Sequence, residues 1–316
     1  MFKRARIQLT LWYVLIIMFV SLFFSVAIYN LISFEISRFA SRPQFRRPEI
    51  DIDFEFVEES KSHLLLQLIY LNGGILIISG SLAYFLAGKT LKPIAKIIEE
   101  QKVFISDASH ELRTPLTALK STFEVALRDD KLSLSEAKNN LKIGVSEVDK
   151  LTHLTNSMLR LSHLENGNGL QHISINLKET VDKVTTRLSA KAKAKKIKIV
   201  NQVKNISING DPSSIDELFE IIIDNAIKYS TGKPIKIFSK NNKVIVKDSG
   251  LGISEKDLLH IFDRFYRSDT ARTKSGEGGY GLGLPIAQKI MQKHGGKIVV
   301  DSKINSGTTV QLIFRN

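Results

Sequence analysis

Two long runs without a charged side chain limit what this chain can fold into. They cover residues 9–32 and 64–88 of a chain of 316 residues. At about 1.5 Å of rise per helical residue, each run can cross a hydrocarbon layer of about 30 Å. We therefore predict two transmembrane helices, at 9–32 and 64–88. The alternative for the first run is a cleaved signal peptide with a small-x-small site at Ser25 and Ala27, which the length of the run disfavours.

Basic residues flank the two runs on one side of the predicted membrane. Lys3, Arg4 and Arg6 precede the first run, and Lys89 and Lys92 follow the second. Because an excess of Lys and Arg marks the cytoplasmic side, we expect both ends of this transmembrane hairpin in the cytoplasm. The N-terminal segment, residues 1–8, would then be cytoplasmic.

The segment between the runs, residues 33–63, is predicted to be a short extracytoplasmic loop. It is too short for an independent sensory domain. From Ile50 to Phe56 acidic and apolar side chains alternate, which predicts a half-buried strand with one acidic face. That face is compatible with a local edge strand and with a surface that binds cations or cationic peptides.

Composition excludes several function classes. The chain has no cysteine, which rules out disulfide frameworks, thiolate zinc sites and cysteine nucleophiles. The net charge of +13 is compatible with nucleic-acid binding. However, the densest basic run, Lys191 to Lys198, carries no aromatic side chains on which bases could stack. We predict a solvated helix end there and no direct contact with nucleic acid.

A polar cluster follows the second run on the outward face of a predicted helix. Residues 89–102 are expected to form a helical signalling linker that continues into this cluster. At about 100° per residue, His110 points away from the apolar stripe, Thr114 lies one turn further on the same face, and Glu111 flanks them. Pro115 is expected to bend the helix. The apolar stripe consists of Phe104, Ala108, Leu112, Leu119, Phe123 and Ala126.

A second amphipathic helix is predicted directly after the first. Ser133 and Glu136 have the spacing of a capping box, which starts helices. An apolar stripe then runs from Leu141 to Leu161. Two such helices carry more apolar surface than one hairpin can bury. Residues 103–168 are therefore predicted to form an all-α helical hairpin that dimerises into a four-helix bundle.

The remaining residues, 169–316, mix strand and helix patterns. This mixture predicts an α+β sandwich with helices on one side of a sheet. The strand candidates are residues 197–200, 235–238, 244–246, 297–300 and 308–314, and the helix candidates are 178–194, 212–229 and 284–294.

Three residue clusters in this last segment suit nucleotide chemistry, and they occur in a fixed order. They contain Asn225, Lys228 and Tyr229, then Asp248, Gly250 and Gly252, then Gly279, Gly281, Leu282 and Gly283. The last glycines let backbone N–H groups at a helix start approach phosphate oxygens. Together with the His110 cluster, these residues resemble the membrane-bound sensor histidine kinases of two-component systems, whose ATP domain has the Bergerat fold. The resemblance covers roughly Lys89 to the C-terminus.

The resemblance implies ATP and Mg²⁺ as cofactors and assigns roles to the clusters. Asp248 would accept a hydrogen bond from the adenine amino group, and Asn225 would bind Mg²⁺. Lys228 and Tyr229 would line phosphate and base. Arg267 would reach the γ-phosphate as a lid spanning 267–279 closes.

The resemblance also implies the reaction and the partners. His110 would be phosphorylated from ATP and would pass the phosphoryl group to an aspartate of a cognate response regulator. Glu111 would hold the proton on one ring nitrogen, and Thr114 would orient water when the kinase acts as a phosphatase. The protein would be a homodimeric ATP-dependent histidine kinase in a bacterial cell membrane, with its catalytic domains in the cytoplasm.

Two other functions are considered. One is an ATP-driven conformational machine of the gyrase or chaperone type. In those relatives a glutamate activates water at the position of Ile221, one turn before Asn225, and isoleucine cannot do this. The other is a membrane scaffold or phosphatase without kinase activity. The intact glycines, Asn225 and Asp248 show no sign of such decay.

Overall fold

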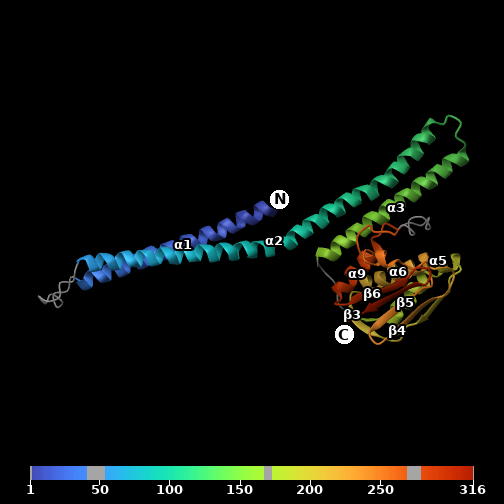
Figure 1. Ribbon diagram of the computed structural model, residues 1–316. Helices are drawn as coiled ribbons and strands as arrows, with labels where there is room; N and C mark the ends of the chain where they lie inside the picture. Colours follow the sequence, from blue (N-terminus) through green and yellow to red (C-terminus); the bar gives the residue numbers. More distant parts are fainter. Residues whose placement is uncertain (1, 41–53, 167–172, 269–278, 316) are drawn as a thin grey trace. The chain divides into compact units, whose positions relative to one another are not determined.

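The computed structural model describes residues 2–40, 54–166, 173–268 and 279–315 (Figure 1). Contacts between Cα atoms divide the chain into two compact units, Met1–Val103 and Phe104–Asn316. The first contains helix α1 (Phe2–Ala40) and the beginning of helix α2 (Phe54–Arg128). The second contains the rest of α2, helix α3 (Leu134–Asn166) and a C-terminal α/β domain.

In the first unit, α1 and α2 carry the two uncharged runs. Both helices are long and apolar enough to cross a membrane, judged by length and composition. Large apolar side chains such as Phe19 and Ile77 are 71% exposed, so they need an apolar environment. The helices are longer than the runs, because α1 continues to Ala40 and α2 begins at Phe54. Within the segment 33–63, residues 33–40 and 54–63 are therefore helical, and its extracytoplasmic location stays a prediction. The predicted strand is wrong at Phe54 to Phe56, which are helical, while residues 50–53 lie outside the described residues.

Polar contacts fix the register between α1 and α2. Asn72 is only 8% exposed, and its amide donates to Ser25 Oγ at 2.8 Å. Ser21 Oγ donates to Asn72 Oδ1 at 2.6 Å. Near the other end, the Arg6 guanidinium lies 3.6 Å from the centre of the Tyr84 ring. An amide with satisfied hydrogen bonds joins two apolar helices more specifically than apolar packing does.

In the second unit, α2 and α3 form the predicted helical hairpin. Helix α2 stays helical through Pro115 and ends at Arg128. The predicted capping box is present, because Ser133 N–H donates to Glu136 Oε2 at 2.9 Å and Glu136 N–H donates to Ser133 Oγ at 3.3 Å. The helices pack closely enough that a Cβ on Gly144 would lie 2.7 Å from the Phe123 ring.

The C-terminal domain is built on a five-stranded sheet with the order β2-β4-β5-β7-β6. Strands β2 and β4 are parallel, and the other neighbours are antiparallel. A separate two-stranded sheet pairs β1 with β3. The strands are β1 (Ile173–Asn176), β2 (Ile199–Gln202), β3 (Ser207–Gly210), β4 (Ile235–Lys240), β5 (Lys243–Lys247), β6 (Lys297–Lys303) and β7 (Gly307–Ile313).

One face of the large sheet forms the core. Alternate strand residues such as Ile237, Val244 and Leu312 are fully buried, as period-two patterning requires. Helices α4, α6 and α9 cover this face with their apolar sides, including Phe219 and Ile290. The helices are α4 (Leu177–Arg187), α5 (Ser189–Ala194), α6 (Pro212–Tyr229), α7 (Glu255–Leu258) and α9 (Gly283–Lys293). The predicted α+β sandwich is confirmed.

Candidate functional site

His110 lies on the exposed face of α2, as the helical pattern predicted. Ala108 is 5% exposed, whereas the His110 side chain is open to solvent. Thr114 is one turn further along, and its Oγ1 donates to the His110 carbonyl oxygen at 3.3 Å. Glu111 is half-buried, and among the described residues no hydrogen bond or ion pair joins it to His110. The imidazole is therefore accessible to a second molecule or domain.

A cavity of about 660 Å³ in the C-terminal domain gathers the predicted nucleotide residues. It lies between α6, α9 and the segment after β5. The predicted residues that line it are Asn225, Lys228, Tyr229, Asp248, Gly252, Arg267, Gly279, Gly281, Leu282 and Gly283. Gly250 does not line the cavity, and its role is to shape the turn that holds Asp248. Residues from four separate parts of the sequence thus meet in one pocket.

Asp248 follows β5 at one end of this cavity and is only 7% exposed. Its Oδ1 accepts from Gly250 N–H at 2.8 Å and from Thr308 N–H at 3.2 Å. Burial raises the pKa of this carboxyl, and the backbone hydrogen bonds oppose that rise. Because both bonds fall on Oδ1, Oδ2 keeps acceptor capacity for a ligand donor such as an adenine amino group.

Gly250 is required because its backbone passes close to the end of α6. A Cβ at this position would lie 2.1 Å from the Tyr229 carbonyl oxygen and 2.9 Å from Asp248 Oδ1. No side chain fits at these distances, so the glycine fixes the carboxylate indirectly.

The start of α9 also lines the cavity, through Leu282 and Gly283. Leu282 is the N-cap of this eleven-residue helix and makes no side-chain cap hydrogen bond, so first-turn N–H groups are available to an anion. Gly281 has φ +71°, and a Cβ there would lie 2.7 Å from the Tyr266 carbonyl oxygen. This turn therefore needs glycine.

Cationic side chains line the cavity as well. Burial and the neighbouring Arg267 lower the pKa of Lys228. Asp224, which also pairs with Lys191 at 2.5 Å, opposes this, and Lys191 and Lys195 add smaller lowering effects. A cluster of positive charge costs free energy until an anion binds. Together with the helix dipole, it makes the cavity suited to phosphate groups.

Asn225 lines the cavity from α6, and Ile221 lies one turn before it on the same wall. The described residues contain no group of three His, Asp or Glu side chains that could hold a metal ion. Mg²⁺ prefers octahedral oxygen ligands and is often held by few protein groups together with phosphates. The Asn225 amide oxygen fits a site of that kind.

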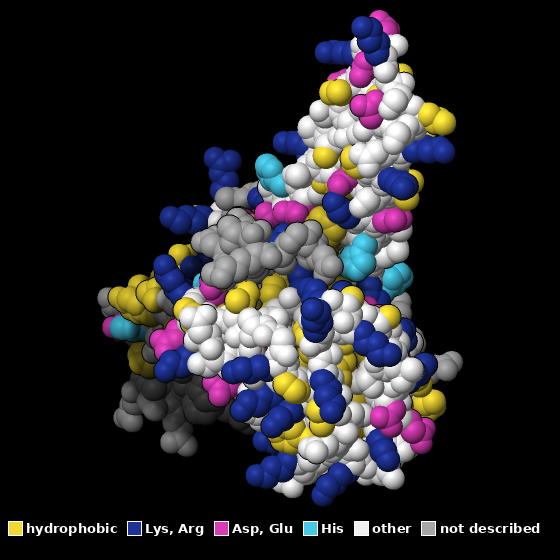
Figure 2. Space-filling view, turned by 90° about the vertical axis from the view of Figure 1, so that its right-hand side faces the viewer, with side chains coloured by type: hydrophobic (Ala, Val, Ile, Leu, Met, Phe, Trp, Pro, Cys, Tyr) yellow, Lys and Arg dark blue, Asp and Glu magenta, His cyan; other side chains and the backbone are white. Residues whose placement is uncertain are grey.

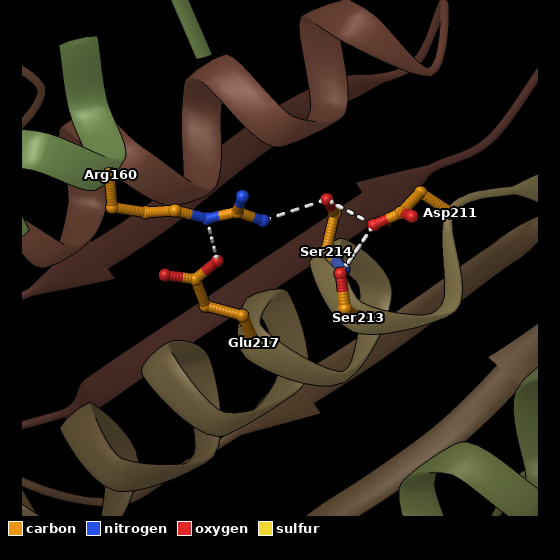
Figure 3. A network of polar contacts seen from close by, with 5 residues as sticks. All are labelled: Arg160, Asp211, Ser213, Ser214 and Glu217. Carbon is orange, nitrogen blue, oxygen red and sulfur yellow. Dashed lines mark hydrogen bonds and ion pairs between the residues drawn. The ribbon is translucent and has the colours of Figure 1, made fainter. Parts of the chain in front are cut away.

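The structure also shows contacts that sequence patterns did not predict. Arg160 on α3 donates to Glu217 Oε2 at 2.6 Å and to Ser214 Oγ at 2.8 Å (Figure 3). Ser214 Oγ in turn donates to Asp211 Oδ1, the N-cap of α6, at 2.6 Å. We call this set the Arg160 network. It joins the hairpin to the helix that carries Asn225.

Two further contacts join the hairpin to the segment after α7. Arg264 pairs with Glu165, and the Phe265 ring packs 5.8 Å from the Phe104 ring. The cavity lining includes His153 of α3 and does not include His110. Sequence patterns could not predict the contacts between the hairpin and the C-terminal domain, because their partners lie more than fifty positions apart and leave no periodic signal. Most of the predicted lid, residues 269–278, lies outside the described residues.

Comparisons with known proteins agree with this architecture. The family model "His Kinase A (phospho-acceptor) domain" matches residues 100–167. The model "Histidine kinase-, DNA gyrase B-, and HSP90-like ATPase" matches residues 210–316. The chain is 37% identical over 235 residues to the signal transduction histidine-protein kinase ArlS of Staphylococcus aureus (strain USA300). That match covers 71% of this chain and 51% of ArlS, so the chain spans about half the length of the curated relatives it matches.

Solved structures point the same way. The Acinetobacter baumannii histidine kinase AdeS is 26% identical with a TM-score of 0.52, over 66% of this chain and 98% of that one. Histidine kinase ThkA, solved in complex with response regulator protein TrrA, is 22% identical with a TM-score of 0.53, over 73% of this chain and 66% of that one, which supports the fold alone. The chain therefore contains a histidine kinase phosphoacceptor domain, which bears His110, followed by an ATPase domain of the histidine kinase and gyrase type, and it is similar to a signal transduction histidine-protein kinase over 71% of its length.

Proposed function

We propose that this protein is a membrane-anchored sensor kinase that phosphorylates His110 from ATP and then phosphorylates an aspartate of a response regulator. The observation that carries the proposal is an exposed histidine on the same compact unit as a nucleotide-shaped cavity. Ile221 replaces the water-activating carboxylate of the gyrase-like relatives, which disfavours a hydrolytic machine. The intact glycines and Asp248 disfavour an inactive scaffold.

The residues divide the work of phosphoryl transfer. Asp248 holds the adenine end, while Lys228 and the first-turn N–H groups of α9 hold phosphate oxygens. Bound Mg²⁺, held by Asn225 and the phosphates, would neutralise charge on the transferred group. A neutral His110 nitrogen attacks the γ-phosphorus, a nitrogen–phosphorus bond forms, and the bond to the β-phosphate oxygen breaks to release ADP. Glu111 stabilises the proton that the other ring nitrogen keeps.

Incubating the full chain with γ-labelled ATP tests this function. We expect label on the protein that is lost in acid and stable in base, as phosphohistidine is. Steady phosphate release without labelled protein would instead indicate the gyrase or chaperone type of ATPase. Neither label nor phosphate release would favour a scaffold or phosphatase.

We expect the ATPase domain to move before transfer. The cavity is lined by His153 and Ser157 of α3 and not by His110. The Arg160 network therefore favours an arrangement of hairpin and ATPase domain in which bound ATP could not phosphorylate His110. Replacing Arg160 by Met should therefore raise the initial rate of autophosphorylation. We expect roughly a two- to tenfold increase, the range for a partly exposed ion pair with a charged hydrogen bond.

The matched control for this prediction is Arg128→Met at the exposed end of α2, which should leave the rate unchanged. Initial rates of label incorporation at saturating ATP provide the measurement. An unchanged or lower rate in Arg160→Met would contradict the idea that this network restrains the domain.

The hairpin is expected to dimerise. Its exposed apolar side chains would pack against a second copy in a four-helix bundle. They include Leu116, Val125, Leu127, Leu141, Val145 and Val148. A response regulator is the proposed second partner, because the phosphoacceptor and ATPase family models both match this chain. Two candidate membrane helices support multi-pass anchoring in a bacterial cell membrane with the catalytic domains in the cytoplasm.

The input signal is proposed to travel along α2 itself. This single helix, Phe54–Arg128, contains both the second uncharged run and His110. Each residue inserted beside Pro93 would rotate His110 by about 100° relative to the run. We predict that kinase output varies with the phase of one to four inserted residues, with four residues closest to the wild type.

The same insertions after Lys131, in the turn between α2 and α3, serve as controls because they leave α2 unchanged. Output is measured as phosphorylated His110 in membranes. A steady decline with insertion length, indifferent to phase, would refute rotational coupling.

A further inference from the structure

The face of the large sheet opposite helices α4, α6 and α9 is basic. Because Ile235, Ile237, Val244, Val246 and Ile298 point into the core, their neighbours on the same strands point outward. The outward lysines are Lys236 and Lys240 on β4, Lys243 and Lys247 on β5, and Lys297 and Lys303 on β6. Within the five strands of the large sheet, Asp301 is the only acidic residue at an outward position. We call this surface the outer sheet face.

The lysines on β4 and β5 stand directly opposite one another. Strand register pairs Lys236 with Lys247 and Lys240 with Lys243. Like charges in directly opposed positions destabilise a sheet. Among the described residues no ion pair joins any of these four lysines to a carboxylate. The outer sheet face therefore carries an electrostatic cost that an anionic partner would relieve.

Apolar side chains lie between these lysines. Phe238 pairs with Ile245 across β4 and β5, and Val299 and Ile313 extend the apolar strip across β6 and β7. All four are partly exposed. Figure 2 shows one side of the C-terminal domain, on which Lys and Arg side chains lie with apolar ones between them; the residues of the outer sheet face itself are assigned from strand register and burial. A mixed basic and apolar surface suits the boundary between lipid headgroups and acyl chains.

The length of the chain favours a bilayer over an acidic protein as the partner. Phe265 of the C-terminal domain packs on Phe104, which is sixteen residues after Gly88, the end of the second uncharged run. Sixteen helical residues span about 24 Å, whereas a domain of this size has a radius of gyration of about 15 Å. A bilayer that holds the second run is thus always within reach, at high effective concentration.

We propose that the outer sheet face docks on the anionic surface of the bilayer that anchors the chain, through Lys236, Lys240 and Lys247. This proposal rests on the membrane anchoring proposed above and not on kinase activity. Docking would make the position of the ATPase domain sensitive to lipid charge. It would be screened by salt, because these charges lie at a solvent-exposed surface.

Energy transfer in nanodiscs tests the proposal with the full chain. The protein lacks cysteine, so a donor dye can be placed at Gln202→Cys, which pairs with Phe238 on the outer sheet face. Acceptor dyes are carried by lipid headgroups. We expect stronger transfer in discs with anionic phosphatidylglycerol than in purely zwitterionic discs, and loss of this difference in 1 M salt.

Charge variants locate the effect. Lys236→Gln, Lys240→Gln and Lys247→Gln together should lower the ratio of docked to free domain on the order of 100-fold, since each lysine near an anionic leaflet contributes roughly fivefold. The matched control, Lys131→Gln, Lys138→Gln and Lys142→Gln, removes the same charge from the far end of the hairpin and should keep the lipid dependence. Unchanged ATP binding verifies that both variants fold.

Three outcomes would overturn the proposal. The first is equal energy transfer in anionic and zwitterionic discs. The second is an equal loss of lipid-dependent energy transfer in the sheet variant and in the hairpin control. The third is a sheet variant whose energy transfer still depends on lipid charge but which no longer passes the phosphoryl group to a response regulator. That result would assign the outer sheet face to a protein partner. A second donor at Thr90→Cys, beside the second uncharged run, reports anchoring itself. Loss of energy transfer from Thr90→Cys would refute membrane anchoring, whereas loss of energy transfer from Gln202→Cys alone would refute docking.

Discussion

Replacing His110 by Gln is expected to abolish autophosphorylation while ATP binding stays unchanged. Glutamine fits the exposed face of α2, so the hairpin should fold normally. It lacks a nucleophilic ring nitrogen, so it cannot accept the phosphoryl group. The measurement is protein label from γ-labelled ATP, together with the dissociation constant for ATP.

His163→Gln is the matched control for this variant. His163 is an exposed histidine on α3 and lies outside the nucleotide cavity. Its replacement should leave the label intact. Acid-labile label that persisted in His110→Gln would show that another residue is the acceptor.

Replacing Asp248 by Asn is expected to weaken ATP binding by about 10- to 100-fold, the value of a charged hydrogen bond of about 1.5 to 3 kcal/mol. The asparagine oxygen can still accept from Gly250 and Thr308, so the turn should keep its shape. The ionised acceptor for the adenine amino group would be lost. Calorimetric titration with ATP measures the effect, and Asp301→Asn at an exposed site on β6 is the control.

The same substitution should not lower the thermal stability of the protein without nucleotide. Burial raises the pKa of Asp248, so the folded state binds its proton more tightly than the unfolded state. Between the unfolded and folded pKa values, stability therefore falls as pH rises, and the ionised carboxylate costs free energy at neutral pH. Asparagine removes that cost. A lower melting temperature in Asp248→Asn would mean that the carboxylate is needed for folding.

The raised pKa also predicts how ATP affinity depends on pH. Acidification protonates Asp248 at a higher pH than it would an ordinary aspartate, and the neutral acid is a weaker acceptor. ATP affinity should therefore fall on acidification in the wild type. In Asp248→Asn this component should disappear, and an identical profile in both proteins would argue against Asp248 as the adenine partner.

Local patterns in the sequence predicted most elements, because their causes are local. The capping box at Ser133 and Glu136 starts α3 one residue later, and Asp211 caps α6 at its predicted start. Apolar segments of the sequence located the five strands of the large sheet to within a few residues. Strands β1 and β3 were missed, because their only apolar residues are Ile173, Ile175 and Ile208, too few to show a period. The extension of α1 to Ala40 was also missed, since its end lies beyond the uncharged run.

The sequence by itself determined which chemistry this protein carries. The spacing around His110, the glycines before α9 and the Asp248 turn are short-range features, and each can be identified without knowing what lies nearby in space. Only the tertiary structure decided which side chains share the cavity and which contacts join the hairpin to α6. Arg160 meets Glu217 across 57 positions, and the lysine pairs of the outer sheet face depend on strand register. Such contacts follow from the packing of the whole domain, and no single segment of the sequence contains the information that specifies them.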